Sequence, residues 1–279
     1  MSYRSLLVML DQDPLGAART AVAIRLAKDF DCHLTGVAPT GLLDMPVVPE
    51  AAAAYAELAT LAWETMQSQA RDAAERFRTA CRAAGLKSFD AIVDEADIAA
   101  SLVRHAHCSD LTVLTQADPD ASGHRATQAA LEQMVLHSAR PTLILPYAGQ
   151  VTSLGSKVMV AWDDSREAAR ALADALPLLR RAARVQVVAW HETGDEDRAL
   201  RRRLDDVHRW LMWQGVSAEV AVETTEIGIA EAMLSRAAEL EVDLVVMGAY
   251  GHARWTERVL GGATRGLLAA MTVPVLMSH

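Results

Sequence analysis

The chain contains the same sequence pattern twice, and this internal repeat constrains its fold more than any other feature. Residues 6–11 (LLVMLD) recur as residues 158–163 (VMVAWD), 152 positions later. Towards the end of each copy, residues 109–116 (SDLTVLTQ) correspond to residues 242–249 (VDLVVMGA), 133 positions later. Because the two offsets differ by 19, the repeat indicates a duplicated unit whose first copy is about 19 residues longer in its middle.

Each copy alternates short apolar runs with longer helical patterns, as expected for strand–helix–strand units around a parallel sheet. The apolar runs are rich in Val, Ile and Leu without polar alternation, which indicates strands buried on both faces. The sequence therefore predicts an α/β protein made of two tandem five-stranded parallel sheets. The predicted strands are residues 5–10, 33–38, 89–94, 110–115 and 142–146, then 157–162, 185–190, 217–222, 243–248 and 274–277.

The predicted helices lie between these strands, and their positions divide the chain into two domains. The longest helix is expected at residues 50–84 of the first copy, where the additional residues fall. We expect the domains at residues 1–147 and 157–279, joined by the turn-rich segment 147–156 (YAGQVTSLGS). The other predicted helices are residues 15–30, 96–107 and 125–138, then 165–182, 195–214, 227–239 and 257–270.

Composition argues against several classes of protein. The 279 residues include 27 Lys and Arg against 36 Asp and Glu. Without clustered positive charge to neutralise phosphates, nucleic acid is not expected as the main partner. No apolar run reaches the roughly 18 residues of a membrane helix, and Asp11 comes too early for a signal peptide, so we expect a cytoplasmic protein without a membrane partner. The three cysteines lack CxxC spacing, which argues against a disulfide framework.

A glycine-rich segment follows the fourth predicted strand of the second copy. Gly248 and Gly251 bracket a turn, and Gly261 and Gly262 follow after nine more residues, at the start of a predicted helix. Glycines let backbone amides approach an anion closely, and a helix N-terminus adds partial positive charge. Because ligands of parallel sheets bind at the carboxyl ends of the strands, this segment predicts a phosphate-binding loop.

The spacing G-x2-G-x9-G of Gly248, Gly251 and Gly261 resembles the nucleotide-binding pattern of the universal stress protein (UspA) family. Residues 163–165 (DDS) and the closing residues 273–276 (VPVL) are also similar to that family, whose tandem two-domain members match the duplication. The resemblance implies a Rossmann-like fold of the adenine nucleotide alpha hydrolase type, a stress-response role and, in one subclass, bound ATP.

The resemblance also implies roles for residues of the second copy. Asp163 is expected to meet the adenine or ribose end of the nucleotide, and Trp190 to flank the base. The family usually has Ser or Thr directly after the third glycine, where this chain has Gly262, although Thr264 resembles a second polar position. The backbone amides expected to hold phosphates belong to Gly248, Gly251, Gly261 and Gly262.

The first copy keeps the aspartate, Asp11, but not the glycine loop. Its corresponding segment is residues 115–120 (TQADPD), and like charge at Asp118 and Asp120 opposes a polyanion. We therefore expect ATP in the second copy only, with the first copy packed against it as a degenerate partner domain. Single-domain members of the family commonly pair as dimers, and the resemblance implies that a tandem chain can reproduce this pairing between its own two copies. Whether two such chains also form a homodimer stays open, and residues 42–84 are candidates for a pocket cover or an interface.

No catalytic or metal-binding residue is predicted. His105 and His107 are two positions apart on a predicted helix, so their side chains do not face each other. The adjacent residues Asp163 and Asp164 are poorly placed to converge on one substrate. Asp164 or Ser165 instead suits the cap of the helix that follows.

Three functional hypotheses remain open from the sequence. The first is a stress-response module whose second domain binds ATP or another adenine nucleotide without strong catalysis. The second is a nucleotide-free scaffold that acts through dimerisation or a small apolar ligand, and the missing hydroxyl after Gly261 favours it. The third is a weak ATP hydrolase, for which the sequence offers no obvious metal-binding carboxylate or base beyond Asp163.

Overall fold

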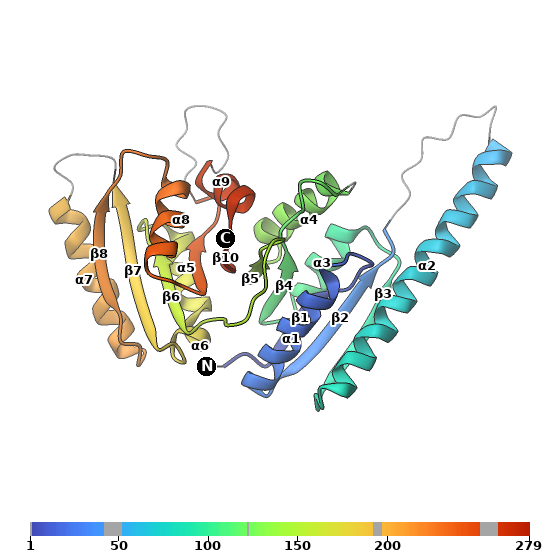
Figure 1. Cartoon of the computed structure of the whole chain (residues 1–279), viewed down its shortest axis with the longest axis horizontal. Coiled ribbons are helices and arrows are strands. Elements are labelled where there is room, and N and C mark those ends of the chain that lie inside the picture. The colour runs from blue at the N-terminus through green and yellow to red at the C-terminus, as the bar shows by residue number, and fades with distance from the viewer. Residues whose placement is uncertain (1, 42–51, 122, 192–196, 252–261) are drawn as a thin grey trace.

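The protein forms one continuous ten-stranded sheet covered by helices on both faces (Figure 1). It is described here by a computed structural model covering residues 2–41, 52–121, 123–191, 197–251 and 262–279. The strands of the first half are β1 (Ser5–Met9), β2 (His33–Pro39), β3 (Phe89–Asp94), β4 (Leu111–Thr115) and β5 (Thr142–Leu145). Those of the second half are β6 (Lys157–Ala161), β7 (Arg184–His191), β8 (Glu219–Thr224), β9 (Leu244–Gly248) and β10 (Val275–Ser278).

Helices connect the strands in both halves, as the sequence predicts. In the first half they are α1 (Gly16–Phe30), α2 (Ala52–Ala83), α3 (Ile98–Ala106) and α4 (His124–His137). In the second half they are α5 (Arg166–Asp174), α6 (Leu176–Leu179), α7 (Asp197–Trp213), α8 (Ile229–Glu239) and α9 (Gly262–Ala270). Within the described residues, no helix is long and apolar enough to span a membrane.

The strand order repeats in the two halves and confirms the predicted α/β fold. The full order is β3-β2-β1-β4-β5-β10-β9-β6-β7-β8, and neighbours within each half are parallel. The halves meet where β5 and β10 pair antiparallel, with Val275 opposite Ile144. In each half the first strand lies between the second and the fourth. In each half the chain therefore winds in opposite directions from the position between the first and fourth strands, which are β1 and β4 or β6 and β9. This position is the topological switch point of an open α/β sheet.

Burial on both faces of the sheet explains why the strands lack polar alternation. Leu6 and Val8 of β1 point into a core that includes residues of α1, α2, α5 and α7. Leu7 points into the opposite core, which includes residues of α3, α4, α8 and α9. All three side chains are fully buried, as successive strand residues must be when helices cover both faces of a sheet.

The prediction of one continuous helix in the second half is wrong. The sequence pattern predicts a single helix over residues 165–182, whereas the structure has α5 and the short α6, with Ala175 between them. Pro177 explains the break, because proline has no backbone N–H and its ring clashes with the carbonyl four residues earlier, that of Ala173.

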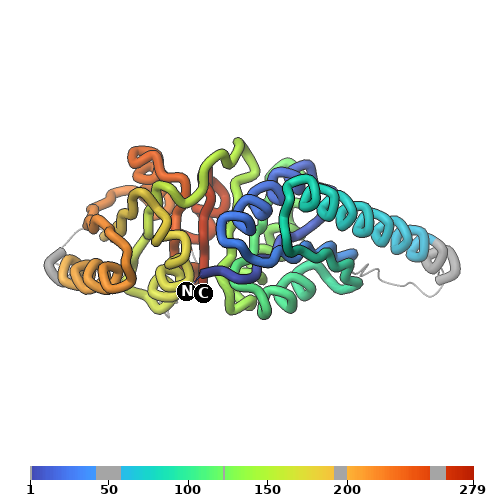
Figure 2. Tube along the Cα trace, turned by 90° about the horizontal axis from the view of Figure 1, so that it is seen from below, coloured from blue at the N-terminus to red at the C-terminus, as the bar shows by residue number. Residues whose placement is uncertain are grey.

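Helix α2 extends along the outer edge of the first half, beyond the region that packs on the sheet (Figure 1, Figure 2). Its 32 residues correspond to a length of roughly 48 Å at 1.5 Å per residue. Leu58 and Leu61 in its N-terminal part are 60% and 56% exposed. The C-terminal part buries Ala70, Ala74 and Phe77 against the sheet. The additional residues of the first copy therefore build a helix whose N-terminal part exposes large apolar side chains among the described residues.

Candidate functional site

A cavity of about 280 Å³ opens at the switch point of the second half, at the carboxyl ends of β6 and β9. Asp163 follows β6 by two residues, Gly248 ends β9, and Gly262 begins α9. The cavity brings together six of the seven residues predicted for the site, and Gly261 lies outside the described residues. Its lining is Ala161, Trp162, Asp163, Trp190, Ile229, Met233, Met247, Gly248, Tyr250, Gly251, Gly262, Ala263 and Thr264.

The glycines at this cavity have a packing role as well as the predicted binding role. A Cβ atom on Gly248 would lie 2.5 Å from the backbone nitrogen of Ala168, and one on Gly251 would lie 2.7 Å from Oε2 of Glu167. Real Cβ atoms do not approach other atoms so closely. The end of β9 and the loop after it therefore rest against the first turn of α5. Only glycine permits this contact at position 248, where the nearest atoms belong to the backbone.

Asp163 lies at the cavity in a locally ordered turn. Its Oδ1 accepts hydrogen bonds from the backbone nitrogen of Ser165 (3.0 Å) and from Ser165 Oγ (2.6 Å). Ser165 Oγ in turn accepts from the backbone nitrogen of Ala168 (3.1 Å), so Ser165 is the N-cap of α5. Of the two caps predicted from the sequence, Ser165 is therefore the observed one. Asp164 instead forms an ion pair with Arg203 of α7 at 2.8 Å.

Thr264 and Tyr250 connect the glycine loop to α9. Thr264 is buried, and its Oγ1 accepts a hydrogen bond from the backbone nitrogen of Tyr250 at 3.2 Å. The Tyr250 hydroxyl has no hydrogen-bond partner among the described residues. Burial, with a contribution from the charge of Glu132, raises the pKa of this hydroxyl to about 12. Tyr250 therefore stays protonated at neutral pH. The residue lines the cavity, its hydroxyl is buried, and the sequence analysis did not predict it as a site residue.

The inner part of the cavity is apolar. Trp190 is half-buried within β7, one residue before the strand ends. Ile229 and Met233 of α8 line the cavity with it. An aromatic ring beside two aliphatic side chains suits a flat apolar ring system, since aromatic rings stack on one another and on aliphatic groups.

A buried carboxylate, that of Glu167, lies beside the glycine loop, and sequence reasoning also missed it. The residue is 3% exposed, and its carboxylate pairs with the guanidinium of Arg166. Burial opposes ionisation of Glu167, but hydrogen bonds from Arg166 and its own backbone, with the charges of Arg166 and His279, hold its pKa below the usual value. Described residues lining the cavity include Asp163 but neither Lys nor Arg. An anion there would be held by backbone amides and the α9 N-terminus.

The corresponding position in the first half is almost closed. The cavity there measures about 40 Å³ and is lined by Asp11, Arg19 and Thr115, among others. Arg19 is 3% exposed; its Nη2 lies 2.8 Å from Oδ2 of Asp11, and its Nη1 donates to Thr115 Oγ1 at 3.0 Å. In the second half, the 152-residue offset places Ala171 at the position of Arg19. A buried arginine therefore fills the space that is open in the second half.

The degenerate loop of the first half contributes to the contact between the halves. Gln116, directly after β4, is 3% exposed. Its Nε2 donates to the backbone oxygen of Leu268 in α9 (2.8 Å), and its Oε1 accepts from the backbone nitrogen of Tyr147 (3.1 Å). Gln116 thus joins the two halves, whereas its counterpart in the second half, Ala249, directly follows β9, the strand that ends at the cavity.

The histidines considered for a metal site have a different arrangement. His105 Nε2 lies 3.1 Å from Oδ2 of Asp94, which also accepts from Ser101 Oγ at 2.6 Å and pairs with Arg104. His107 instead contacts the backbone oxygen of His137 at 3.4 Å. Across the described part of the chain, no group of three or more His, Cys, Asp or Glu side chains is placed to hold a metal ion.

Comparison with known proteins agrees with this arrangement. The model of the universal stress protein family matches residues 156–279. The second half of this chain belongs to the universal stress protein family. No curated protein matches the chain.

Solved structures extend the likeness in fold to the first half. The crystal structure of a universal stress protein from Archaeoglobus fulgidus matches with a TM-score of 0.75 at 18% identity, covering 98% of this chain and 95% of that one. A functionally unknown protein from Pseudomonas aeruginosa PAO1 matches with a TM-score of 0.59 at 16% identity, covering 99% and 92%. The chain as a whole therefore has the fold of a tandem universal stress protein, as the resemblance in sequence implied.

Proposed function

We propose that this chain is a stress-response module whose second half binds ATP or another adenine nucleotide in the cavity at the ends of β6 and β9, without strong catalysis. The observation that carries the proposal is the convergence, at one switch point, of Asp163, the glycine backbone at Gly248 and Gly251, and the N-terminus of α9. Parallel α/β sheets bind their ligands at this position.

The shape of the cavity supports a nucleoside-sized ligand. Its volume of about 280 Å³ is close to the lower end of the roughly 300–1,000 Å³ of small-molecule pockets. In the proposed complex the base lies against Trp190, Ile229 and Met233, and the ribose hydroxyls donate to Asp163. The phosphates then point towards Gly262, where the unpaired N–H groups and the dipole of α9 stabilise negative charge.

We propose that the first half, residues 1–147, is a partner domain without a nucleotide. The Arg19–Asp11 pair occupies the place where a nucleoside would bind. The first half instead contributes β5 and Gln116 to its contacts with residues 157–279. The functional unit in this proposal is the pair of halves within one chain.

The test is a titration of the purified chain with ATP, ADP and AMP by isothermal calorimetry, comparing Gly262→Asp with Gly262→Ala. Gly262 is exposed at the first position of α9, where an acidic residue favours the helix. We therefore expect both variants to fold, but the aspartate to weaken binding at least about tenfold, which is about 1.4 kcal/mol. Equal affinities for the two variants would place the phosphates elsewhere.

The same preparation distinguishes the competing hypotheses. We expect nucleotide to raise the melting temperature of the chain, because a ligand that binds only the folded state stabilises it, and we expect no release of inorganic phosphate. Phosphate release abolished by Asp163→Ala would instead support the hydrolase. The absence of any response to all three nucleotides would support the nucleotide-free scaffold.

A further inference from the structure

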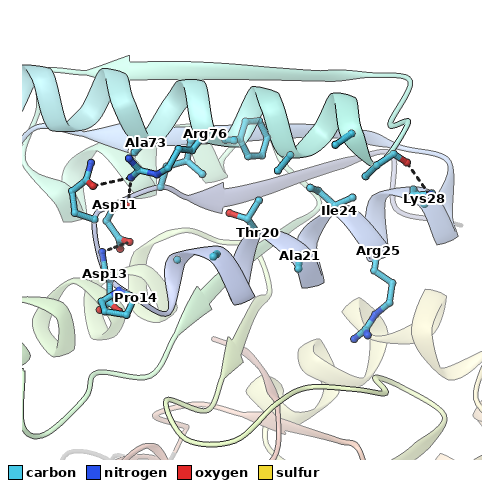
Figure 3. A pocket seen from close by; sticks show the side chains of 18 of the residues that line it. Asp11, Asp13, Pro14, Thr20, Ala21, Ile24, Arg25, Lys28, Ala73 and Arg76 are labelled. Carbon is cyan, nitrogen blue, oxygen red and sulfur yellow. Dashed lines mark hydrogen bonds between the residues drawn. The ribbon is translucent and has the colours of Figure 1, made fainter.

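A second and larger cavity lies in the first half, away from the proposed nucleotide site. It measures about 930 Å³ and is a groove between α1 and α2 (Figure 3). Leu10, Ile24 and Phe77, all buried, form its apolar base. The 152-residue offset places Trp162 at the position of Leu10 in the second half, where the larger indole is 8% exposed and packed in the core. The two halves therefore differ at the base of this groove, although they share one fold.

Small side chains allow another backbone to come close to this groove. The groove-facing residues of α2 include the alanines Ala73, Ala80 and Ala83, with Arg76 between them, spaced three or four apart as on one face of a helix. From α1, Ala21 also lines the groove. Alanine-lined faces of this kind accept the larger side chains of a packing helix, as ridges fit into grooves.

The same face of α2 carries large apolar side chains farther along the helix. Leu58 precedes Arg76 by 18 residues, which is five turns at 3.6 residues per turn, so the two positions share one face. Leu61 lies one turn from Leu58 on that face. Both leucines are more than half exposed. One helix face thus presents leucines at one end and an alanine-lined groove at the other, which makes it self-complementary.

The two ends of α2 also carry opposite net charges, so that two copies of the helix can be complementary in charge. Residues 52–70 contain two acidic residues and no Lys or Arg, a net charge of −2. Residues 71–83 contain four arginines against Asp72 and Glu75, a net charge of +2. Antiparallel alignment of two such helices places the acidic half of each against the basic half of the other, whereas parallel alignment brings like charges together.

We propose that a second copy of this chain docks on this surface, with the two α2 helices antiparallel and Leu58 of each copy seated opposite Ala80 of the other. This arrangement is isologous, so each contact occurs twice around a two-fold axis near Gln69. Residues 58–83 of α2 and the length of α1 give a footprint of roughly 600 Å² per copy, from 1.5 Å rise and 10 Å diameter. That is close to the roughly 800 Å² per partner of a standard interface.

Sedimentation velocity of the full chain tests the proposal. We expect a species of twice the 30.1 kDa chain mass, and we expect the double variant Leu58→Glu with Leu61→Glu to weaken the dimer at least about tenfold, because four leucines lose their apolar burial. The matched control is Met212→Glu with Trp213→Glu on α7, two residues that are 55% and 74% exposed, and it should leave the dimer unchanged. A wild-type monomer, or equal dimerisation of both double variants, would overturn the proposal.

A disulfide measurement tests the antiparallel geometry separately. Gln69→Cys is introduced with Cys108→Ser, because Cys108 is exposed whereas Cys32 and Cys81 are buried. The proposed two-fold axis predicts rapid oxidation of Gln69→Cys to a linked dimer, and slow oxidation of Leu58→Cys in the same background. Rapid oxidation of both variants would show a parallel pair, and slow oxidation of Gln69→Cys would show that the helices do not meet at this axis; either result would overturn the arrangement.

Discussion

The two halves of the chain share one strand order but differ at the same structural position, the carboxyl ends of their central strands. The second half has a cavity of about 280 Å³ there, and the first half has one of about 40 Å³. The difference depends on few residues: Ala171 and Gly248 in the second half correspond to Arg19 and Thr115 in the first. Two copies of one fold can therefore differ in the size of a cavity at the same position while the sheet of each remains intact.

The opposite difference occurs between the helices that cover the sheet. The first half is open between α1 and α2, and in the second half the larger Trp162 replaces Leu10. Each half thus has an open space at a place where the other half carries a bulkier residue, Arg19 in the first half and Trp162 in the second. This exchange suggests a division of roles, with small-ligand binding in the second half and assembly in the first.

The largest expected effect is on the side chain that closes the first half. Arg19→Ala removes a buried guanidinium and leaves Asp11 and Thr115 without its contacts. Breaking a buried ion pair costs about 3–5 kcal/mol, and because Asp11 is 23% exposed we expect the lower end, about 3 kcal/mol, in urea unfolding. The control Arg82→Ala breaks an exposed pair with Glu75 and should cost less than about 1 kcal/mol. Similar losses for the two variants would show that the Arg19 pair is not a structural element.

The reciprocal substitution should close the second half. Ala171→Arg introduces the first half's arginine beneath the cavity, within reach of Asp163, and we expect ATP affinity to fall at least about 30-fold, which is about 2 kcal/mol. Ala173→Arg adds the same side chain at an exposed position of α5 and should leave affinity unchanged. Calorimetric titration measures both, and unaltered binding by Ala171→Arg would contradict the equivalence of the two positions.

A smaller effect is expected at the buried carboxylate beside the glycine loop. Glu167→Gln removes a negative charge near the proposed phosphate position, so ATP affinity should rise about fivefold, which is about 1 kcal/mol for one nearby charge at the protein surface. Glu241→Gln removes a carboxylate that is 78% exposed and pairs with Lys157, and it serves as the control. Weaker binding of ATP to Glu167→Gln would contradict this expectation, because it would show that the carboxylate stabilises the complex.

The smallest expected effect comes from restoring a hydroxyl. Gly262→Ser places a hydroxyl where the family pattern has one, at the start of α9. One additional hydrogen bond contributes about 0.5–1.5 kcal/mol, so we expect roughly threefold tighter binding of ATP by calorimetry, with adenosine affinity unchanged because adenosine has no phosphate. An equal gain for adenosine would locate the effect away from the phosphates.

The sequence predicted the fold because its signals are local or repeated. Ten apolar runs, the duplication and the glycine spacing are all visible along the chain, and the strands lie where those runs predict. The break between α5 and α6 was missed, although Pro177 was a local signal for it.

The side chains that decide the chemistry were harder to predict. Arg19 and Thr115 are 96 residues apart, and a polar residue within a helix gives no indication that it is buried against a distant strand end. Glu167 resembles an ordinary acidic residue in the first turn of a helix, yet tertiary packing buries it beside Gly251. The groove between α1 and α2 likewise depends on how two helices pack, which periodicity alone does not determine.

The most direct test of the central difference between the halves is the stoichiometry of nucleotide binding. Calorimetric titration of the full-length chain with ATP is predicted to give one site per chain, lost in Ala171→Arg and retained in Ala173→Arg. Two sites per chain would contradict the closure of the first half by Arg19. No site at all would contradict nucleotide binding at the ends of β6 and β9.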